Sequence, residues 1–419
     1  RSNPLRVIVL LALVAGIVYV NQVVVPATPP LFVATPTPTR APGSFVKDAD
    51  TLIAKGKVNQ AIEAYKAAAK ADPQNPAVYV TLARWQVLNG DLDGATENVQ
   101  NALLINPNHA LAHAVNGWIL GKKKEYLQAE AELKDVALAQ DPNSALAWAY
   151  LTEVYVGELQ DNKGDLNTQQ RAIDASQEAM RLDSSLMEVH RARGLVFEIT
   201  TQHAEAITEY ENAVEINPNL ADLYISLGRE YRLTDQYPQS VEALMKAISL
   251  RPDDPDPYGE LAATYLKAGD FSKGIQIAEQ AVQKKPGDAF LQGLLGTMYF
   301  KSERYGEAVN PLRLAVRGGI TTDGTRVDPV VLDPQDASSV AYYSRFGIAL
   351  SNIGQCAEAL QLAQELVQKI PGDEIVAANT QVMIDNCKQQ AEGTPAKAGT
   401  PTPAATVEDA AAATPASNP

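Results

Sequence analysis

The chain has 419 residues, of which 46% are hydrophobic and 20% are charged, and its formal net charge at pH 7 is -15. This length is far more than one small hydrophobic core requires. The negative charge argues against a general nucleic-acid-binding protein, because such proteins need a basic face to neutralise phosphates. An acidic balance serves mainly to keep a protein soluble.

The N-terminal segment is apolar over residues 5–25 (LRVIVLLALVAGIVYVNQVVV), long enough to cross a hydrocarbon core of about 30 Å. The basic residues at its N-terminal end are Arg1 and Arg6, and the next basic residue along the chain is Arg40. The positive-inside bias therefore predicts a cytoplasmic N-terminus. A cleaved signal peptide is the alternative, but its apolar region is usually shorter and no Ala-x-Ala site follows. We therefore expect a transmembrane signal anchor over residues 1–25. The rest of this single-pass protein would then lie in the periplasm or at the cell surface.

Two segments are rich in proline, threonine and alanine. Residues 26–44 follow the apolar segment, and we expect an extended, semi-rigid linker there, since proline fixes the backbone and lacks a donor. Residues 392–419 have almost no large apolar side chains, and we expect a disordered tail. Composition leaves open whether either segment is O-glycosylated.

Proline recurs at a fixed interval between these segments. Pro73 and Pro107 are 34 residues apart, and so are Pro218, Pro252 and Pro286 in turn. Small residues also recur at fixed distances before each of these prolines. A period of this length indicates an array of helix–turn–helix units, each of which buries its apolar face only against a neighbour.

The residues between the prolines resemble the tetratricopeptide repeat. The unit that begins at Ala221 carries the family's characteristic residues Tyr224, Leu227, Gly228, Tyr231, Ser240, Leu244, Ala247 and Pro252. The small residues let two helices approach closely, while the large ones fill the space between them. The resemblance implies an all-α, right-handed superhelical solenoid. We expect a membrane-anchored bacterial member of this family with about nine repeats over residues 45–373.

Several units depart from the regular period. The third is one residue longer, since Pro142 follows Pro107 by 35 residues. We expect insertions at 157–171 and 317–336, and a polar capping helix at 374–391 that closes the solenoid. Such insertions often carry binding loops. Both are rich in aspartate but lack the ordered ligands of an EF-hand, so solvated loops or partner contacts are preferred to a calcium site.

The chain has two cysteines, Cys356 and Cys387. In the repeat register they fall at the same edge of neighbouring helices. An exported domain permits a disulfide, which would attach the capping helix to the array. The alternative is two unpaired, buried cysteines.

The family resemblance also implies where a partner would bind, namely on the concave face lined by the first helix of each unit. Carried over position by position, the candidate partner-binding residues are Arg84, Trp118, Glu153, Arg191, Leu195, Arg229, Arg232 and Phe300. Arginine beside aromatic side chains is typical of a protein-recognition hot spot. The alternative is that the arginines pair internally with Glu198, Glu230 or Asp222.

The sequence offers little for catalysis. Two of the four histidines, His113 and His190, occupy a position that packs in the core, and no cysteine or carboxylate repeats at metal-ligand spacing. Phosphate-binding loops and nucleophile elbows are also missing from the sequence. We therefore expect no catalytic residue, metal, cofactor, nucleic acid or small-molecule substrate.

Together these patterns predict a membrane-anchored, extracytoplasmic scaffold. Its partners would be other proteins, held as peptide segments or as membrane-complex subunits, with residues 5–25 in the membrane. Two alternatives remain open at this point. One is a permanent accessory subunit of a large membrane complex, and the other is a holdase-like chaperone for exported proteins.

Overall fold

The computed structural model describes residues 3–24 and 40–392. Most of the expected linker and tail, and Val25 of the apolar segment, lie outside the described residues. The first element is the helix α1 (Pro4–Tyr19), which continues as a π-helical turn η1 (Val20–Val24). The helical stretch Pro4–Val23 has 20 residues and a mean hydropathy of 2.1, and its side chains are exposed. By length and composition it is able to cross a membrane.

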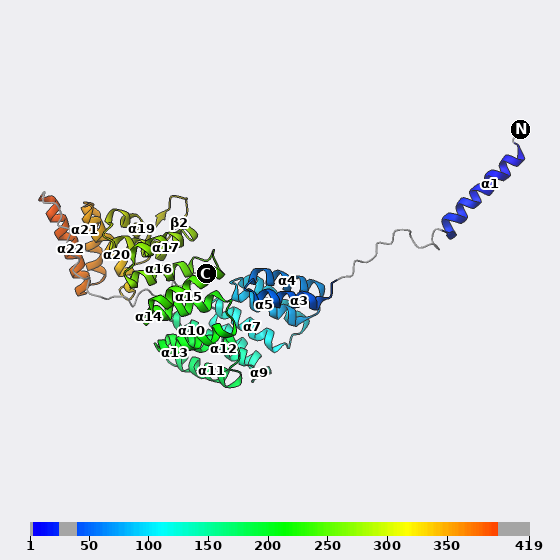
Figure 1. Ribbon diagram of the computed structural model, residues 1–419, viewed down its shortest axis with the longest axis horizontal. Coiled ribbons are helices and arrows are strands. Elements are labelled where there is room, and N and C mark those ends of the chain that lie inside the picture. Colours follow the sequence, from blue (N-terminus) through cyan, green and yellow to red (C-terminus); the bar gives the residue numbers. More distant parts are fainter. Residues whose placement is uncertain (1–2, 25–39, 393–419) are drawn as a thin grey trace.

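Within residues 40–392 the helices fall into nine consecutive packed pairs, followed by one closing helix, α22 (Glu374–Ala391) (Figure 1). The pairs are α3 (Pro42–Ala54) with α4 (Val58–Ala71), α5 (Pro76–Leu88) with α6 (Leu92–Ile105), α7 (Ala110–Lys122) with the segment α8–η2–α9 (Tyr126–Ala131, Glu132–Ala137 and Leu138–Gln140), α10 (Ala145–Gln160) with α11 (Thr168–Leu182), α12 (Met187–Ile199) with α13 (His203–Ile216), α14 (Ala221–Leu233) with α15 (Tyr237–Leu250), α16 (Asp256–Ala268) with α17 (Phe271–Lys284), α18 (Ala289–Lys301) with α19 (Tyr305–Arg317), and α20 (Ala337–Asn352) with α21 (Cys356–Lys369). The fold is therefore an all-α superhelical solenoid.

Small residues allow the two helices of a pair to approach each other closely. A Cβ atom added at Gly228 of α14 would lie 2.4 Å from Cγ of Leu244 in α15. At the equivalent Gly296 of α18, the added atom would lie 2.5 Å from Cγ of Leu312 in α19. Real Cβ atoms do not tolerate such distances, so a larger residue at either position would force the opposite leucine to move. The leucines opposite are completely buried and fill the space that the glycines leave.

The extra residue of the third unit is accommodated inside its second helix. This helix is interrupted by the π-helical segment η2 (Glu132–Ala137), between α8 and α9. A π-helical turn bonds residues five apart instead of four, so it accommodates one extra residue within an otherwise α-helical segment. The bulge therefore restores the register before the next proline, Pro142.

The two expected insertions take different forms. Part of 157–171 extends α10 as far as Gln160, so that the remaining loop before α11 is short. The segment 317–336 contains a short antiparallel hairpin, in which β1 (Gly319–Ile320) pairs with β2 (Arg326–Val327). The periodicity did not predict these strands. Buried Val327 and Val330 fix the segment to the array, where the Tyr343 hydroxyl donates to the carbonyl of Val330 at 3.2 Å.

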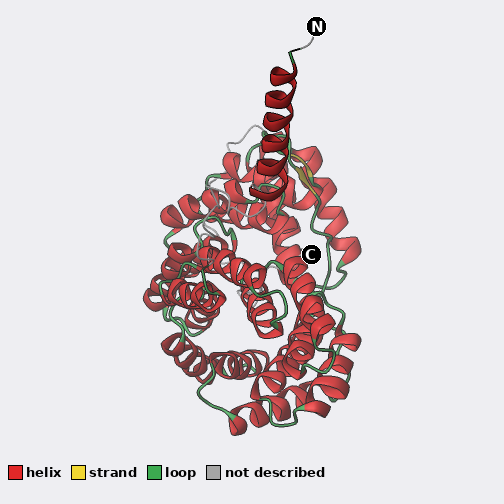
Figure 2. Ribbon diagram, turned by 90° about the vertical axis from the view of Figure 1, so that its right-hand side faces the viewer, coloured by secondary structure: helices red, strands yellow, loops and turns green. Residues whose placement is uncertain are grey.

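The superhelix is tight enough for distant units to touch. Figure 2 shows the helices arranged in a ring. Nδ2 of Asn219, in the turn before α14, donates to the carbonyl oxygen of Ala54 at the end of α3, at 3.1 Å. The first unit thus contacts the start of the sixth. A solenoid in which units touch only their neighbours would lack this contact.

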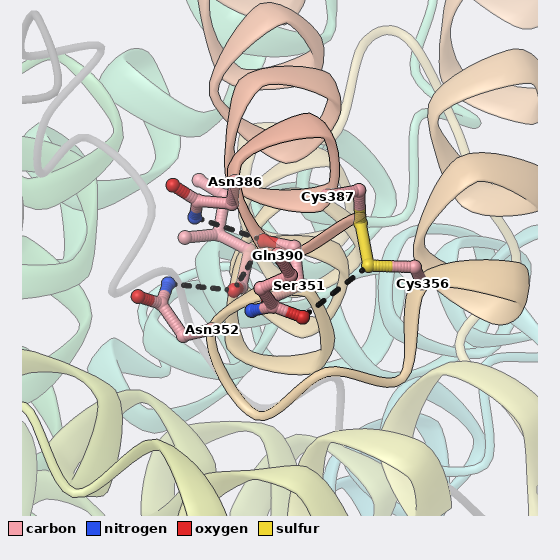
Figure 3. The surroundings of a disulfide bond; sticks show 7 residues. Ser351, Asn352, Cys356, Asn386, Cys387 and Gln390 are labelled. Carbon is pink, nitrogen blue, oxygen red and sulfur yellow. Dashed lines mark hydrogen bonds between the residues drawn. A yellow bond between two sulfur atoms is a disulfide. The ribbon is translucent and has the colours of Figure 1, made fainter. Parts of the chain in front are cut away.

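The C-terminal end is closed by α22, which packs against α20 and α21. Cys356 at the start of α21 and Cys387 in α22 form a disulfide, with 5.6 Å between their Cα atoms (Figure 3). Nε2 of Gln390 donates to the carbonyl of Ser351 at 2.6 Å, and Nδ2 of Asn386 donates to Oγ of the same serine at 3.1 Å. A covalent bond and two hydrogen bonds therefore hold the closing helix to the ninth unit.

Candidate partner-binding surface

The structure brings four of the sequence-predicted binding residues into one cluster. Trp118 of α7, Glu153 of α10 and Arg191 of α12 are in direct contact. Leu195 of α12 lines a cavity of about 160 Å³ together with Trp118 and Glu153. Three consecutive first helices thus meet at this point on the inner face of the superhelix.

Glu153 is the centre of this cluster. One of its carboxylate oxygens accepts from Nε of Arg191 at 2.8 Å, and the other accepts from the indole N–H of Trp118 at 2.8 Å. Nζ of Lys122 lies 3.1 Å from the same carboxylate. Burial raises the pKa of Glu153, but the charges of Arg191 and Lys122 and the hydrogen bonds outweigh it, so the pKa falls to about 2. The carboxylate is therefore ionised at neutral pH.

Aromatic rings enclose the same ion pair. Trp118 stacks on Tyr150 with a centroid distance of 4.4 Å and an interplanar angle of 5°. The guanidinium of Arg191 lies 5.1 Å from the Trp118 ring centroid. Nε of Arg84 donates to the Tyr150 hydroxyl at 3.1 Å, and its other end pairs with Glu188. Because Arg84 belongs to the second unit and Glu188 to the fifth, this ion pair spans the inner face.

A second cluster surrounds Glu260 of α16. Its two carboxylate oxygens accept from Nε of Arg229 at 3.1 Å and from Nη2 of Arg232 at 2.6 Å. Nη1 of Arg229 also lies 3.1 Å from Glu198 in α12. Burial alone would raise the pKa of Glu260. The charges and hydrogen bonds of the two arginines have the larger effect, so the pKa of Glu260 lies below its ordinary value. Arg229 therefore links the fifth, sixth and seventh units.

These contacts bury four of the eight expected partner-binding residues. Trp118, Glu153, Arg191 and Arg232 are only 1%, 7%, 8% and 2% exposed. The physical reason is the tight curvature, which lets charged side chains of successive first helices reach one another and exclude water. Internal pairing, the alternative considered from the sequence, is observed between Arg229 and Glu198. Sequence reasoning missed Glu153, Glu188 and Glu260 as partners of the arginines.

The remaining predicted residue lies apart from both clusters. Phe300 of α18 packs edge-on against Tyr305, with 5.5 Å between ring centroids, and is half-buried. The inner-face clusters involve the second to the seventh units. Phe300 belongs to the eighth and contributes to neither.

A separate groove lies between two second helices. It has a volume of about 500 Å³, with α13 and α15 as its walls and α14 as its floor. Tyr224, Leu227 and Tyr231 form the floor. On α14, Tyr231 is two residues from Arg229, so it points to nearly the opposite side of the helix from the inner face. Sequence reasoning did not single out this groove, although Tyr231 was recognised as a repeat residue.

His113 and His190 are each engaged with a carboxylate. Nδ1 of His113 lies 2.7 Å from Glu132, and Nδ1 of His190 lies 2.6 Å from Glu209. The other ring nitrogen of each lies 2.8 Å from a backbone carbonyl. Across residues 3–24 and 40–392, no group of three or more His, Cys, Asp and Glu side chains is placed to hold a metal ion.

Comparisons with known proteins agree with the helical pairs. A tetratricopeptide repeat family model matches residues 52–119, and a second TPR repeat model matches residues 228–269. The chain is similar to a "Tetratricopeptide repeat and J domain-containing co-chaperone DNJ1" of Cryptococcus neoformans var. grubii, with 29% identity over 110 residues. That alignment covers 26% of this chain and 21% of the relative, so the chain spans only about a fifth of the relative's length.

The chain also aligns with solved structures at low sequence identity. The APC/C hetero-tetramer Cut9–Hcn1 aligns with 16% identity and a TM-score of 0.48, over 60% of this chain and 48% of that chain. A tetratricopeptide repeat protein from Parabacteroides merdae aligns with 14% identity and a TM-score of 0.45, over 66% and 98% of the two chains. Pseudomonas aeruginosa pilF aligns with 18% identity and a TM-score of 0.44, over 59% and 97%.

Proposed function

Because this chain belongs to the tetratricopeptide repeat proteins, whose arrays act in protein–protein interaction, we propose that it is a membrane-anchored, extracytoplasmic scaffold. It organises or assembles envelope or membrane complexes by binding other proteins. The observation that carries this proposal is the exposed apolar helix Pro4–Val23 ahead of the repeat array. Such a helix would hold the array at a membrane surface.

The dimensions and flanking charges support an anchor. Twenty helical residues at about 1.5 Å each span about 30 Å, the thickness of the hydrocarbon core. Arg6 is at the start of the helix, and the next basic residue is Arg40. This asymmetry favours a cytoplasmic N-terminus and an array on the other side.

The disulfide supports the same compartment. Disulfides persist in the periplasm and at cell surfaces, whereas cytosolic thiols are kept reduced. Cys356 and Cys387 are bonded to each other. An extracytoplasmic array is consistent with this bond.

Membrane fractionation and protease accessibility test the anchor and its orientation. The full chain is expected to stay with the membranes in alkaline carbonate, and protease added from the extracytoplasmic side should degrade the array. Replacing Val9 and Leu13 with lysine should release the chain, because charges in the membrane core are costly. Release of the unmodified chain by carbonate, or protection of the array from external protease, would contradict the proposal.

A permanent accessory subunit is the second candidate. Ala12, Ala15 and Gly16 place small residues three to four positions apart on α1. Small residues at this spacing permit close packing of transmembrane helices. Purification in mild detergent separates the candidates. A subunit would co-purify with membrane proteins at fixed stoichiometry, whereas a scaffold would capture partners in a salt-sensitive manner.

A holdase is the third candidate, and only the description of the similar protein as a co-chaperone favours it. A holdase would suppress the aggregation of unrelated unfolded proteins. A scaffold with specific partners would not.

A further inference from the structure

Five consecutive first helices carry an aromatic residue at the eleventh position of the unit. These residues are Tyr155, Phe197, Tyr231, Tyr265 and Tyr299. Four of the five rings are covered by a cation from the chain itself. The guanidinium or ammonium lies close to the ring centroid in the pairs Arg171–Tyr155 (4.6 Å), Arg193–Phe197 (4.5 Å), Lys273–Tyr265 (5.6 Å) and Arg304–Tyr299 (4.7 Å).

Tyr231 is the exception. Among residues 3–24 and 40–392, no lysine or arginine lies over its ring. The sequence explains why. Lys273 and Arg171 each directly precede a buried small residue of the second helix (Gly274 and Ala172), and the residue directly before the equivalent Ser240 is Gln239.

The other two sources of a cation are also replaced in this unit. Arg304 follows its tyrosine by five residues, where Tyr231 has Gln236. Arg193 precedes Phe197 by four residues, where Tyr231 has Leu227. The chain therefore supplies no cation from any of the positions that serve the other rings.

The uncovered ring belongs to an open groove with acidic edges. The lining residues of the groove of about 500 Å³ between α13 and α15 are Glu211, Val214, Glu215, Tyr224, Leu227, Tyr231, Gln239, Glu242, Ala243 and Lys246. Three of them are carboxylates and one is a lysine. The Tyr231 hydroxyl donates to Glu211. Burial, this hydrogen bond and the charges of Glu211 and Glu242 all raise the pKa of Tyr231, so the ring stays neutral beside them.

In the fourth unit, the equivalent tyrosine has both a carboxylate and an arginine beside it. The Tyr155 hydroxyl donates to Oε1 of Glu130 at 2.8 Å, and Nη1 of Arg171 donates to the same oxygen at 2.8 Å. Arg171 thus contacts both the ring and the carboxylate. Tyr231 and Glu211 repeat two of these three components.

We propose that the groove between α13 and α15 binds an arginine side chain of a partner protein, which lies over Tyr231 and pairs with Glu211 and Glu242. The proposal rests on the proposed function, in that the partner is a protein. Arginine covers three of the four equivalent rings, and its planar guanidinium can stack on an aromatic face and bind a carboxylate at once. Val214, Leu227 and Ala243 offer apolar surface to a neighbouring side chain of the same segment.

The test uses the full-length chain in detergent and two peptides. One peptide carries arginine flanked by leucines, and the other carries citrulline, which has the same shape but no charge, in place of the arginine. Binding is measured by calorimetry. The citrulline peptide should bind about tenfold more weakly, because it loses the cation–π contact and the ion pairs.

A substitution within the chain locates the site. Gln239→Arg should supply the cation from the position that Arg171 and Lys273 use, and should therefore weaken binding of the arginine peptide about tenfold. Gln239→Met is the matched control, since it has a similar length and no charge, and should leave binding unchanged. Glu211→Gln with Glu242→Gln should weaken binding as well. Glu205→Gln, an exposed position on α13 outside the groove lining, should not.

The proposal is wrong if neither peptide binds, if both bind equally, or if Gln239→Arg binds the arginine peptide as well as Gln239→Met does. Retention of membrane partners is measured separately on the unmodified chain. Loss of all partners there would contradict the scaffold, whereas the peptide result concerns only the groove.

Discussion

Glu153 shows how a buried charge stabilises the inner face of the superhelix. Its carboxylate lies between Arg191, Lys122 and the Trp118 indole, and it is ionised because these groups lower its pKa to about 2. Trp118, Glu153 and Arg191 come from three successive units. The ion pair between Glu153 and Arg191 is therefore a contact between units. Removing one partner of such a pair leaves a buried charge without compensation.

We expect Glu153→Gln to lower the free energy of unfolding by about 3 kcal/mol at neutral pH. The pKa of Glu153 is depressed in the folded state, so its contribution is complete above the ordinary value of 4.5 and is lost as the pH falls towards 2. Urea unfolding followed by circular dichroism at several pH values measures this effect. The variant should lose part of the acid dependence that the unmodified chain shows between about pH 4.5 and pH 2.

Glu178→Gln is the control for this prediction. Glu178 pairs with Arg181 on the exposed surface of α11, where ion pairs contribute little to stability. The prediction would be contradicted if Glu153→Gln and Glu178→Gln had equally small effects.

At the scale of single elements, the closing helix α22 depends on a covalent bond. It is the last described helix, and it has packing partners on one side only, α20 and α21. The disulfide between Cys356 and Cys387 closes a loop of 31 residues by sequence separation. A cross-link of this span stabilises the folded state by about 3–4 kcal/mol in the chain-entropy treatment.

We expect Cys356→Ser with Cys387→Ser to destabilise α22 before the rest of the array. Hydrogen exchange of the α22 amides should become faster, while exchange in α14 and α16 stays the same. Reduction of the unmodified chain should have the same local effect. If exchange in α22 were unchanged, the hydrogen bonds of Gln390 and Asn386 to Ser351 would be sufficient to hold the helix.

The proline period predicts most elements of the array but not their irregularities. It indicates paired helices because glycines such as Gly228 and leucines such as Leu244 recur at fixed positions, and these contacts lie within one unit. The hairpin at 317–336 has no such repeat signal, since it depends on local turns and on the burial of Val327. The extra residue before Pro142 was visible in the sequence, but its location in the π-helical segment η2 was not.

The contacts among the inner-face side chains could not be predicted from the repeat pattern, for a physical reason. The repeat pattern places Arg84 and Arg191 on the first helices but does not set the pitch of the superhelix. Whether Arg84 of the second unit reaches Glu188 of the fifth depends on that pitch, which small angles between many units determine. The groove beside Tyr231 could have been found by comparing the units with one another, because Gln239 stands where Lys273 supplies a cation.

At the scale of the whole molecule, the contact between the first and sixth units is expected to hold the superhelical turn closed. Nδ2 of Asn219 donates to the carbonyl of Ala54, and Oδ1 of the same residue lies 2.9 Å from a Cβ atom added at Gly56. The ion pair of Arg84 with Glu188 is the second contact across the turn. Both contacts join residues more than a hundred positions apart in the chain.

We expect Asn219→Ala combined with Arg84→Met to open this turn. Asn219→Ala removes a neutral hydrogen bond, worth about 1 kcal/mol, and Arg84→Met removes both the charged hydrogen bond to Glu188 and the one to Tyr150, which are worth more, while the contacts between neighbouring units remain. Small-angle X-ray scattering should therefore show a larger radius of gyration with unchanged helical content, and hydrogen exchange should be faster in α3 and α4. Asn108→Ala is the matched control, because Asn108 ends the same Asn-Pro-Asn sequence in an earlier unit and is exposed. An unchanged radius in the double variant would mean that packing between neighbouring units alone sets the curvature, and that the contact with Ala54 follows from it.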